Sequence, residues 1–220
     1  MHKLEADSIL LEFGTRKILS DIYLKCETGK MIGILGRNGE GTSCLMNIIY
    51  GSLPAISKSI RFDNASVFYA YKRPELLQYL PQFNFVPKSL TLKRIFSDFN
   101  LNYGEFENWF PEFQAKYTSQ LKNLSGGERR VIEVYVIIKT KSKFTLLDEP
   151  FTHVMPLHIE KLKQILTEEK NNKGFLITDH LYKQIIDACD NLYVLSNGKT
   201  HFIQNITDIE KLGYARTQNL

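Results

Sequence analysis

The chain has 220 residues, of which 43% are hydrophobic, and a formal net charge of +4. Such a chain can bury most of a real core in one domain without disulfides, and its modest charge, spread along the sequence, does not suggest nucleic acid as a partner. Cys26, Cys44 and Cys189 are far apart, which favours neither a disulfide framework nor a zinc site and fits a reducing compartment. No segment has the apolar length of a secretory signal or of a bilayer span of about 20 residues, so we expect a soluble chain.

Strand patterns come first. Residues 3–12 and 17–26 alternate polar with apolar or β-branched residues and are predicted to form an antiparallel pair, joined by a turn at Gly14. Residues 31–35 (MIGIL) form an uninterrupted apolar run, which is typical of a strand buried on both faces of a parallel sheet. The glycine-rich segment GRNGEGTS follows, and the apolar spacing after it predicts a helix of two turns or slightly more that ends at Gly51.

Aromatic residues are concentrated in the middle third of the chain, among helical patterns such as TLKRIFSDF. They are Phe83, Phe85, Phe96, Phe99, Phe106, Trp109, Phe110, Phe113 and Tyr117. This segment is predicted to be a helical insertion whose aromatic residues form its own small core. Part of the cluster could instead be a docking surface for another protein.

The last third returns to alternating helices and strands. Expected in order are a helix in GGERRVIEVYVIIK, a strand at FTLLD, a helix from Pro156 to about Lys170, a strand at GFLIT, a helix in LYKQIIDA and a hairpin of NLYVLS and KTHFI around Asn197-Gly198. This alternation predicts an α/β fold with a parallel sheet. Thr207 and Glu210 are predicted to form the capping box of a final short helix, and the chain after Gly213 is expected to be loosely held.

The segment from Gly36 to Ser43 resembles the phosphate-binding pattern G-x-x-x-x-G-K-[ST], except that Thr42 occupies the lysine position. In such a loop, backbone N–H groups and the N-terminus of the following helix converge on phosphate oxygens. Ser43 supplies the hydroxyl that ligates Mg²⁺. With its lysine missing, the loop alone is equally compatible with a structural turn.

Two further segments bear on this choice. FTLLDE ends a buried strand with Asp148 and Glu149, which as neighbours on a strand should point in opposite directions. Asp148 is predicted to lie beside a metal, and Glu149 to face outward, where it could orient or deprotonate an attacking water. LSGGE (residues 124–128) places a serine and two glycines at the start of a long helix, which is a second anion site by geometry. One nucleotide needs both cradles only if the site is shared between two subunits.

The order of GRNGEGTS, YLPQ, LSGGE, TLLDEP and ITDH resembles the nucleotide-binding subunit of an ATP-binding cassette (ABC) transporter, over essentially the whole chain. The resemblance implies a P-loop NTPase core of RecA-like type, with an N-terminal antiparallel β subdomain and a helical subdomain at about residues 83–140, in a single domain of residues 1–220. It implies binding of ATP and Mg²⁺ and an ATPase activity. It also implies a transmembrane permease as partner, and a second ATP-binding subunit in a homodimer or heterodimer. The location implied is cytoplasmic, at the inner face of the cell membrane. Within the family, the sequence leans towards the ATPases of branched-chain amino-acid uptake and lipopolysaccharide export.

Roles for individual residues follow from the same resemblance. Phe13 would stack on adenine, Glu149 would be the general base, and His180 would sense the γ-phosphate. The Mg²⁺ site would comprise Ser43, Gln82 and Asp148, and Gln82 would also join the metal and the water to the membrane partner. Ser125, Gly126 and Gly127 would close over the ATP of the opposite subunit. The nucleotide would further contact Gly36, Asn38, Gly39, Glu40, Gly41, Thr42, Ser43 and Cys44.

The chain departs from the family pattern at two places. Met155 stands where an aspartate usually follows the acidic pair, within Thr152–Met155, which puts communication across the dimer in question. Thr42 lacks the lysine charge, which predicts weakened binding and impaired hydrolysis. The site could be a naturally degenerate binding or regulatory subunit, the threonine could be an engineered or accidental replacement, or another cation could substitute. Arg37 lies in the loop, but in the family this position points away from the phosphates.

Overall fold

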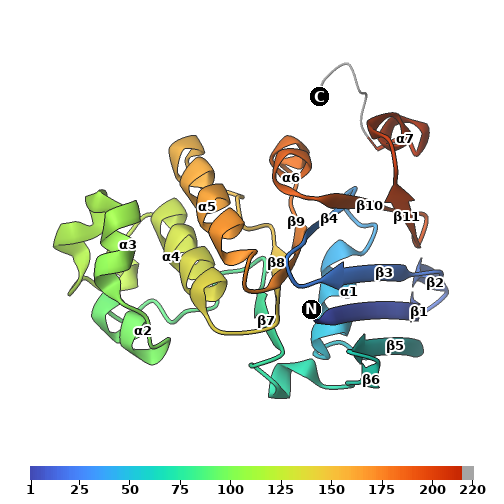
Figure 1. Cartoon of the computed structure of the whole chain (residues 1–220), viewed down its shortest axis with the longest axis horizontal. Helices are drawn as coiled ribbons and strands as arrows, with labels where there is room; N and C mark the ends of the chain where they lie inside the picture. Colours follow the sequence, from blue (N-terminus) through green and yellow to red (C-terminus); the bar gives the residue numbers. More distant parts are fainter. Residues whose placement is uncertain (215–220) are drawn as a thin grey trace.

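The computed structural model describes residues 1–214 and contains two β-sheets with helices packed around them (Figure 1). The strands are β1 (Lys3–Phe13), β2 (Arg16–Leu19), β3 (Tyr23–Glu27), β4 (Met31–Gly36), β5 (Ser57–Phe62), β6 (Ala65–Ser66), β7 (Leu77–Leu80), β8 (Phe144–Asp148), β9 (Gly174–Thr178), β10 (Asn191–Ser196) and β11 (Lys199–Ile203). The α-helices are α1 (Thr42–Tyr50), α2 (Leu92–Asp98), α3 (Tyr103–Trp109), α4 (Gly126–Lys139), α5 (Pro156–Glu169), α6 (Tyr182–Ala188) and α7 (Ile206–Lys211). Short 3-10 helices lie at η1 (Ala70–Lys72), η2 (Pro111–Lys116) and η3 (Leu121–Asn123). The chain after Gly213 was expected to be loosely held. From residue 215 onwards, this segment lies outside the described residues.

The larger sheet has the strand order β11-β10-β4-β9-β8-β7. Strands β10, β4, β9, β8 and β7 are parallel, and β11 closes the edge as the antiparallel arm of the predicted hairpin. Central strands β8 and β9 are buried at every position, as their uninterrupted apolar runs predicted. The α/β fold class is therefore confirmed. Because the strands are parallel, their carboxyl ends meet at one edge of the sheet, where ligands bind in such folds.

The smaller sheet is antiparallel and joins β2, β1, β5 and β6, with β3 also paired to β1. The prediction of one strand over residues 17–26 was wrong, because β2 and β3 are separate. Between them the chain turns towards the β10–β11 hairpin, and the backbone N–H groups of Ser20 and Asp21 donate to the Gly198 carbonyl. The β5–β6 hairpin had not been predicted; its turn residues Asp63 and Asn64 both have positive φ.

Two apolar cores lie on opposite faces of the larger sheet. One core joins α1 and the antiparallel sheet to the larger sheet through residues such as Ile34, Leu146 and Leu176. The other packs α4, α5 and α6 against residues such as Leu147 and Ile177. In Figure 1, α1 and the antiparallel sheet accordingly lie on one side of β8 and β9, and α4 and α5 on the other.

The aromatic residues of the middle third mostly pack inside, but they join the core on the α4–α5 face of the larger sheet, so the prediction of a separate small core was wrong. Phe96, Phe106, Phe110 and Phe113 are almost fully buried around Tyr135 of α4, and the ring centroids of Phe106 and Tyr135 lie 4.9 Å apart. Phe83, by contrast, is 72% exposed. The suggestion that part of the cluster forms a docking surface therefore stays a prediction, and it now concerns the exposed rings.

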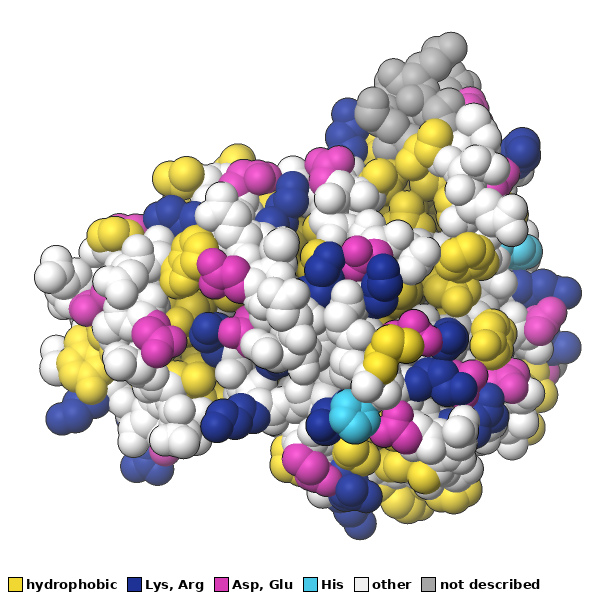
Figure 2. All heavy atoms as spheres, in the orientation of Figure 1, with side chains coloured by type: hydrophobic (Ala, Val, Ile, Leu, Met, Phe, Trp, Pro, Cys, Tyr) yellow, Lys and Arg dark blue, Asp and Glu magenta, His cyan; other side chains and the backbone are white. Residues whose placement is uncertain are grey.

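The surface matches the even distribution of charge in the sequence. Figure 2 shows basic and acidic side chains interspersed over the displayed face rather than gathered by sign. The three cysteines are free. None of the helices within residues 1–214 is both long and apolar enough to cross a membrane.

The N-terminal cap of α7 differs from the prediction. The helix begins at Ile206, and the backbone N–H of Asn205 donates to Asp208 Oδ2 at 3.0 Å. The capping box over Thr207 and Glu210 was therefore wrong by two residues, because Asn205 is itself a favourable N-cap and comes first in the chain.

Candidate active site

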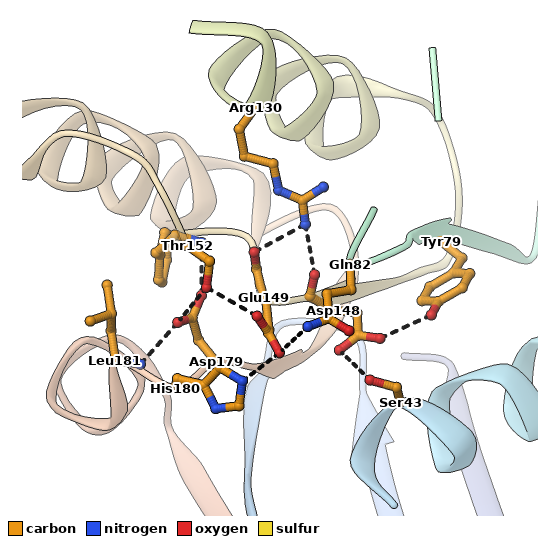
Figure 3. A network of polar contacts seen from close by, with 11 residues as sticks. Ser43, Tyr79, Gln82, Arg130, Asp148, Glu149, Thr152, Asp179, His180 and Leu181 are labelled. Atoms are coloured by element: carbon orange, nitrogen blue, oxygen red, sulfur yellow. Dashed lines mark hydrogen bonds and ion pairs between the residues drawn. The ribbon is translucent and has the colours of Figure 1, made fainter. Parts of the chain in front are cut away.

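The predicted site residues of the core lie at the carboxyl edge of the parallel sheet. The phosphate loop follows β4, Gln82 follows β7, Asp148 ends β8, and His180 follows β9. Figure 3 shows Ser43, Gln82, Asp148, Glu149 and His180 side by side in one polar network.

The loop between β4 and α1 depends on its glycines. Gly39 and Gly41 have φ angles of 85° and 99°, which L side chains rarely adopt. At Gly41 space is also lacking, because a Cβ there would lie 2.7 Å from Ile18 Cγ2 of β2. These positions let the chain turn sharply from β4 into the first turn of α1.

The start of α1 is able to accept an anion. Its N-cap, Gly41, has no side chain to cap the helix. Within residues 1–214, the backbone N–H groups of Thr42, Ser43 and Cys44 have no hydrogen-bond acceptor. Three adjacent unsatisfied donors at the positive end of a helix form the arrangement that binds phosphate oxygens. The loop therefore fits a nucleotide phosphate.

Thr42 contributes no charge to this loop. Its methyl group packs back on β4, since a Cβ built on Gly36 would lie 2.6 Å from Thr42 Cγ2. Arg37 points elsewhere, because its guanidinium donates to the backbone carbonyl of Gly213 after α7. Neither side chain places a cation over the free N–H groups.

Ser43 faces the carboxylate of Asp148. The Ser43 hydroxyl donates to Asp148 Oδ1 at 3.2 Å, and the Tyr79 hydroxyl donates to Oδ2 at 3.1 Å. Asp148 is only 1% exposed, and this burial raises its pKa above the ordinary value, while the two hydroxyl bonds oppose the shift. A hydroxyl beside one carboxylate suits Mg²⁺, which binds few protein oxygens and takes its other ligands from water and phosphate.

Glu149 lies deeper than the sequence suggested. It follows the end of β8 and has a φ of 51°, so the alternation of strand side chains does not govern its direction. The residue is only 7% exposed, and the expectation that it faces outward was wrong. Its positive φ turns the carboxylate along the carboxyl edge of the sheet, towards β7 and β9.

Three side chains surround the Glu149 carboxylate. Gln82 Nε2 donates to Oε1 at 2.7 Å, and His180 Nε2 lies 2.7 Å from the same oxygen. The Thr152 hydroxyl donates to Oε2 at 3.2 Å. The His180 side chain is 49% exposed and Gln82 is exposed as well, so two of the partners of this carboxylate border solvent.

Two buried groups that sequence reasoning missed hold this arrangement. Arg130 of α4 donates to the backbone carbonyls of Pro81, Asp148 and Glu149 at 2.9, 2.7 and 3.0 Å. The sequence carries only one signal of this role, which is that Arg130 places a charge in the otherwise apolar pattern of the helix after LSGGE. Asp179 accepts from the backbone N–H groups of Phe151 and Leu181 at 2.8 and 2.9 Å, and so joins the segments that follow β8 and β9.

The remaining predicted residues lie apart from this network. Ser125 caps α4, with its hydroxyl accepting from the Glu128 N–H at 3.2 Å, and Gly126 and Gly127 form the first turn. Within the described residues no hydrogen bond joins this turn to residues 36–44. Phe13, at the end of β1, is 55% exposed. The structure thus brings together the loop and the acidic residues, and leaves Ser125–Gly127 outside that network.

A parallel sheet with an anion cradle after one strand and a buried aspartate opposite its hydroxyl defines the P-loop NTPase class. The comparisons place the chain within that class. The family model described as ABC transporter matches residues 19–152, which is more than half of the chain. The protein therefore belongs to the ABC transporter family, as an ATP-binding subunit.

Similar proteins agree with this assignment. The lipopolysaccharide export system ATP-binding protein LptB of Haemophilus influenzae is 28% identical over 214 residues, covering 90% of this chain and 89% of LptB. The high-affinity branched-chain amino acid transport ATP-binding protein BraG of Pseudomonas aeruginosa is 26% identical, and the match covers 89% of this chain and 90% of BraG. A solved ATP-binding subunit of an ABC transporter superposes with a TM-score of 0.79 at 21% identity, and the match covers 98% of this chain and 96% of the solved one. This last likeness concerns the fold alone.

Proposed function

We propose that this ATP-binding subunit works as one of a pair, and that ATP binding and hydrolysis between the pair drive transport by a separate membrane subunit. The observation that carries the proposal is the network in which Ser43, Asp148, Glu149, Gln82 and His180 meet beside three free backbone donors. The chain would act at the cytoplasmic face of a membrane through that partner. The cargo stays unspecified, because the relatives are named for different transport systems.

The proposed roles follow from the contacts. Ser43 and Asp148 would hold Mg²⁺, which supplies positive charge to the phosphates when bound. Glu149 would accept a proton from the attacking water, and for this Gln82 or Thr152 must yield its place on the carboxylate to the water. His180, half exposed on the same oxygen, would then turn to the γ-phosphate.

The position of the second cradle supports the proposed pairing of two subunits. Ser125 and Gly126 are exposed at the start of α4, and no hydrogen bond connects them to the phosphate loop within residues 1–214. A phosphate on this turn would therefore belong to another subunit. The helices at about residues 83–140 would form the subdomain that carries this turn, within a single domain.

Thr42 is the residue expected to limit phosphate binding and hydrolysis at this site. A lysine ammonium about 4 Å from a phosphate oxygen would attract it by about 4 kcal/mol at an effective dielectric constant of about 20, before desolvation. A threonine hydroxyl cannot replace that charge. Because transition-state charge sets the rate of phosphoryl transfer, we expect MgATP to bind weakly and to turn over slowly.

The test is the Thr42→Lys variant of the purified chain. We expect its ATPase rate to exceed that of the unchanged chain by about a hundredfold, which is the effect of one preorganised electrostatic contact. The matched control is Ser52→Lys, at an exposed position just after the end of α1, which adds the same charge away from the phosphate loop and should leave the rate unchanged. Equal rates for the Thr42→Lys variant and the unchanged chain would contradict the proposal.

A second function is favoured by the same threonine. A subunit whose loop lacks its cation could sense nucleotide, or hold the complex together, without hydrolysis. In that case Thr42→Lys leaves transport unchanged, whereas a variant that cannot bind ATP fails to assemble with the membrane subunit. Transport and co-purification, measured on the same variants, separate the two functions.

A further inference from the structure

Strand β2 runs directly beside the phosphate loop. A Cβ built on Gly41 would lie 2.7 Å from Ile18 Cγ2, and one built on Gly39 would lie 3.9 Å from Arg16 Nη2. Arg16 and Ile18 are two residues apart on a strand, so they share a face. That face is the one turned to the loop.

Phe13 shares this face with Arg16. The two residues are direct cross-strand partners in the β1–β2 hairpin, and such partners project to the same side of a sheet. The aromatic ring, the guanidinium and the loop glycines thus follow one another along one surface. The order matches that of a base and its phosphates.

The positive charge of Arg16 is available to a ligand. Within residues 1–214 its side chain forms no salt bridge or hydrogen bond, whereas Lys17 Nζ lies 3.9 Å from Glu12 Oε1. The charged residues of the loop itself are engaged elsewhere. Arg37 donates to the Gly213 carbonyl, and Glu40 Oε2 accepts from the Asn197 N–H at 2.9 Å.

We propose that Arg16 binds the nucleotide's phosphates and supplies, from β2, the positive charge that Thr42 does not supply from the loop. The inference rests on the proposed function and adds a residue to its site. A guanidinium suits the task because its planar fork of N–H groups matches two phosphate oxygens at once. The residue is exposed and long enough to reach across the Gly39 backbone.

The first experiment measures MgATP affinity of the full chain by calorimetry. Arg16→Ala is expected to weaken binding about tenfold, which corresponds to about 1.4 kcal/mol. Lys17→Ala removes the same charge from the adjacent position and is expected to change affinity less than about twofold, because Lys17 points to the other face. Thermal unfolding of both nucleotide-free variants should match the unchanged chain, since both side chains are exposed.

A second arm distinguishes a phosphate contact from a base contact. Inorganic tripolyphosphate, which has no base or ribose, is used as a competitor of MgATP. We expect Arg16→Ala to weaken tripolyphosphate by the same factor as ATP. Weakening of ATP alone would place Arg16 on the base or ribose and overturn the inference.

A third arm tests whether Arg16 replaces the missing lysine. In the Thr42→Lys background, Arg16→Ala should cost less than about threefold in MgATP affinity, because the two cations then serve the same phosphates. A full tenfold loss in both backgrounds would show independent roles and contradict the replacement.

The experiments also separate the inference from the proposed function on which it rests. If the unchanged chain binds no MgATP, the proposed function itself fails. If the unchanged chain binds MgATP and Arg16→Ala binds it equally well, only the inference fails.

Discussion

The phosphate loop and the acidic ends of the strands contribute to one site but are held in opposite ways. The loop presents free backbone donors and carries no cation of its own over them. The acidic end is buried and fully partnered, with Asp148 and Glu149 each receiving hydrogen bonds from side chains. The contrast teaches that buried, fully partnered carboxylates can lie beside a phosphate loop that has no cation of its own.

The largest effect is expected from Glu149→Gln, which tests whether the phosphate loop or the acidic end limits turnover. In the Thr42→Lys background, Glu149→Gln should lower the ATPase rate about a thousandfold, because a positioned general base contributes about 10² to 10⁴. In the unchanged chain the same substitution should have a much smaller effect, since the loop already limits the rate. Steady-state phosphate release measures both. An equal fold-loss in the two backgrounds would mean that the loop is not limiting.

Arg130 offers a way to loosen the acidic end alone. Arg130→Met leaves three buried carbonyls and Glu133, 3.7 Å from the guanidinium, without their charged partner. The free energy of unfolding should fall by about 3 to 5 kcal/mol, measured by urea denaturation. Arg94→Met, which breaks an exposed pair with Asp98, should cost less than about 1 kcal/mol. Similar losses for the two variants would argue against a buried anchor.

The loop can be strained without touching the acidic end. Gly41→Ala combines a φ of 99° with a contact to Ile18, and should destabilise the protein by about 2 to 4 kcal/mol. Gly29→Ala has a similar φ of 88° but open space around the new methyl group, and should cost about 1 to 2 kcal/mol. The difference between the two melting curves isolates the contact with β2. Equal losses would show that β2 does not press on the loop.

The smallest effect concerns pH. Burial raises the pKa of Asp148, so the folded chain binds this proton more readily than the unfolded chain, and stability falls as pH rises through the raised pKa. Asp148→Asn removes that cost and should raise the free energy of unfolding at neutral pH by about 1 kcal/mol. The gain should shrink as the pH is lowered towards the ordinary carboxyl range. Asp98→Asn, at an exposed pair, serves as the control; a gain that is independent of pH would contradict the assignment.

Much of the fold could be predicted because its elements are locally specified. The uninterrupted apolar runs at residues 31–35, 144–148 and 174–178 indicated buried parallel strands, and Asn197-Gly198 indicated the hairpin. The split between β2 and β3 could not be predicted in this way. It depends on Ser20 and Asp21 bonding to Gly198, which is far away in the sequence.

The site shows the same division. The motifs indicated Ser43, Gln82, Asp148, Glu149 and His180, and the structure places them together, although their roles stay predictions. The direction of Glu149 was missed because it depends on a positive φ after the strand. Arg130 was missed because its bonds reach carbonyls far away in the sequence, and the position of Arg16 beside Gly39 likewise depends on how β2 packs against the loop.

Arg130 has a consequence for how such proteins diverge. Its bonds end on main-chain carbonyls at the carboxyl ends of β7 and β8, and these are present whatever side chains the neighbouring positions carry. Mutations that remove the acids of the site would therefore leave its framework standing. Loss of these carboxylates would therefore be separable from loss of the fold.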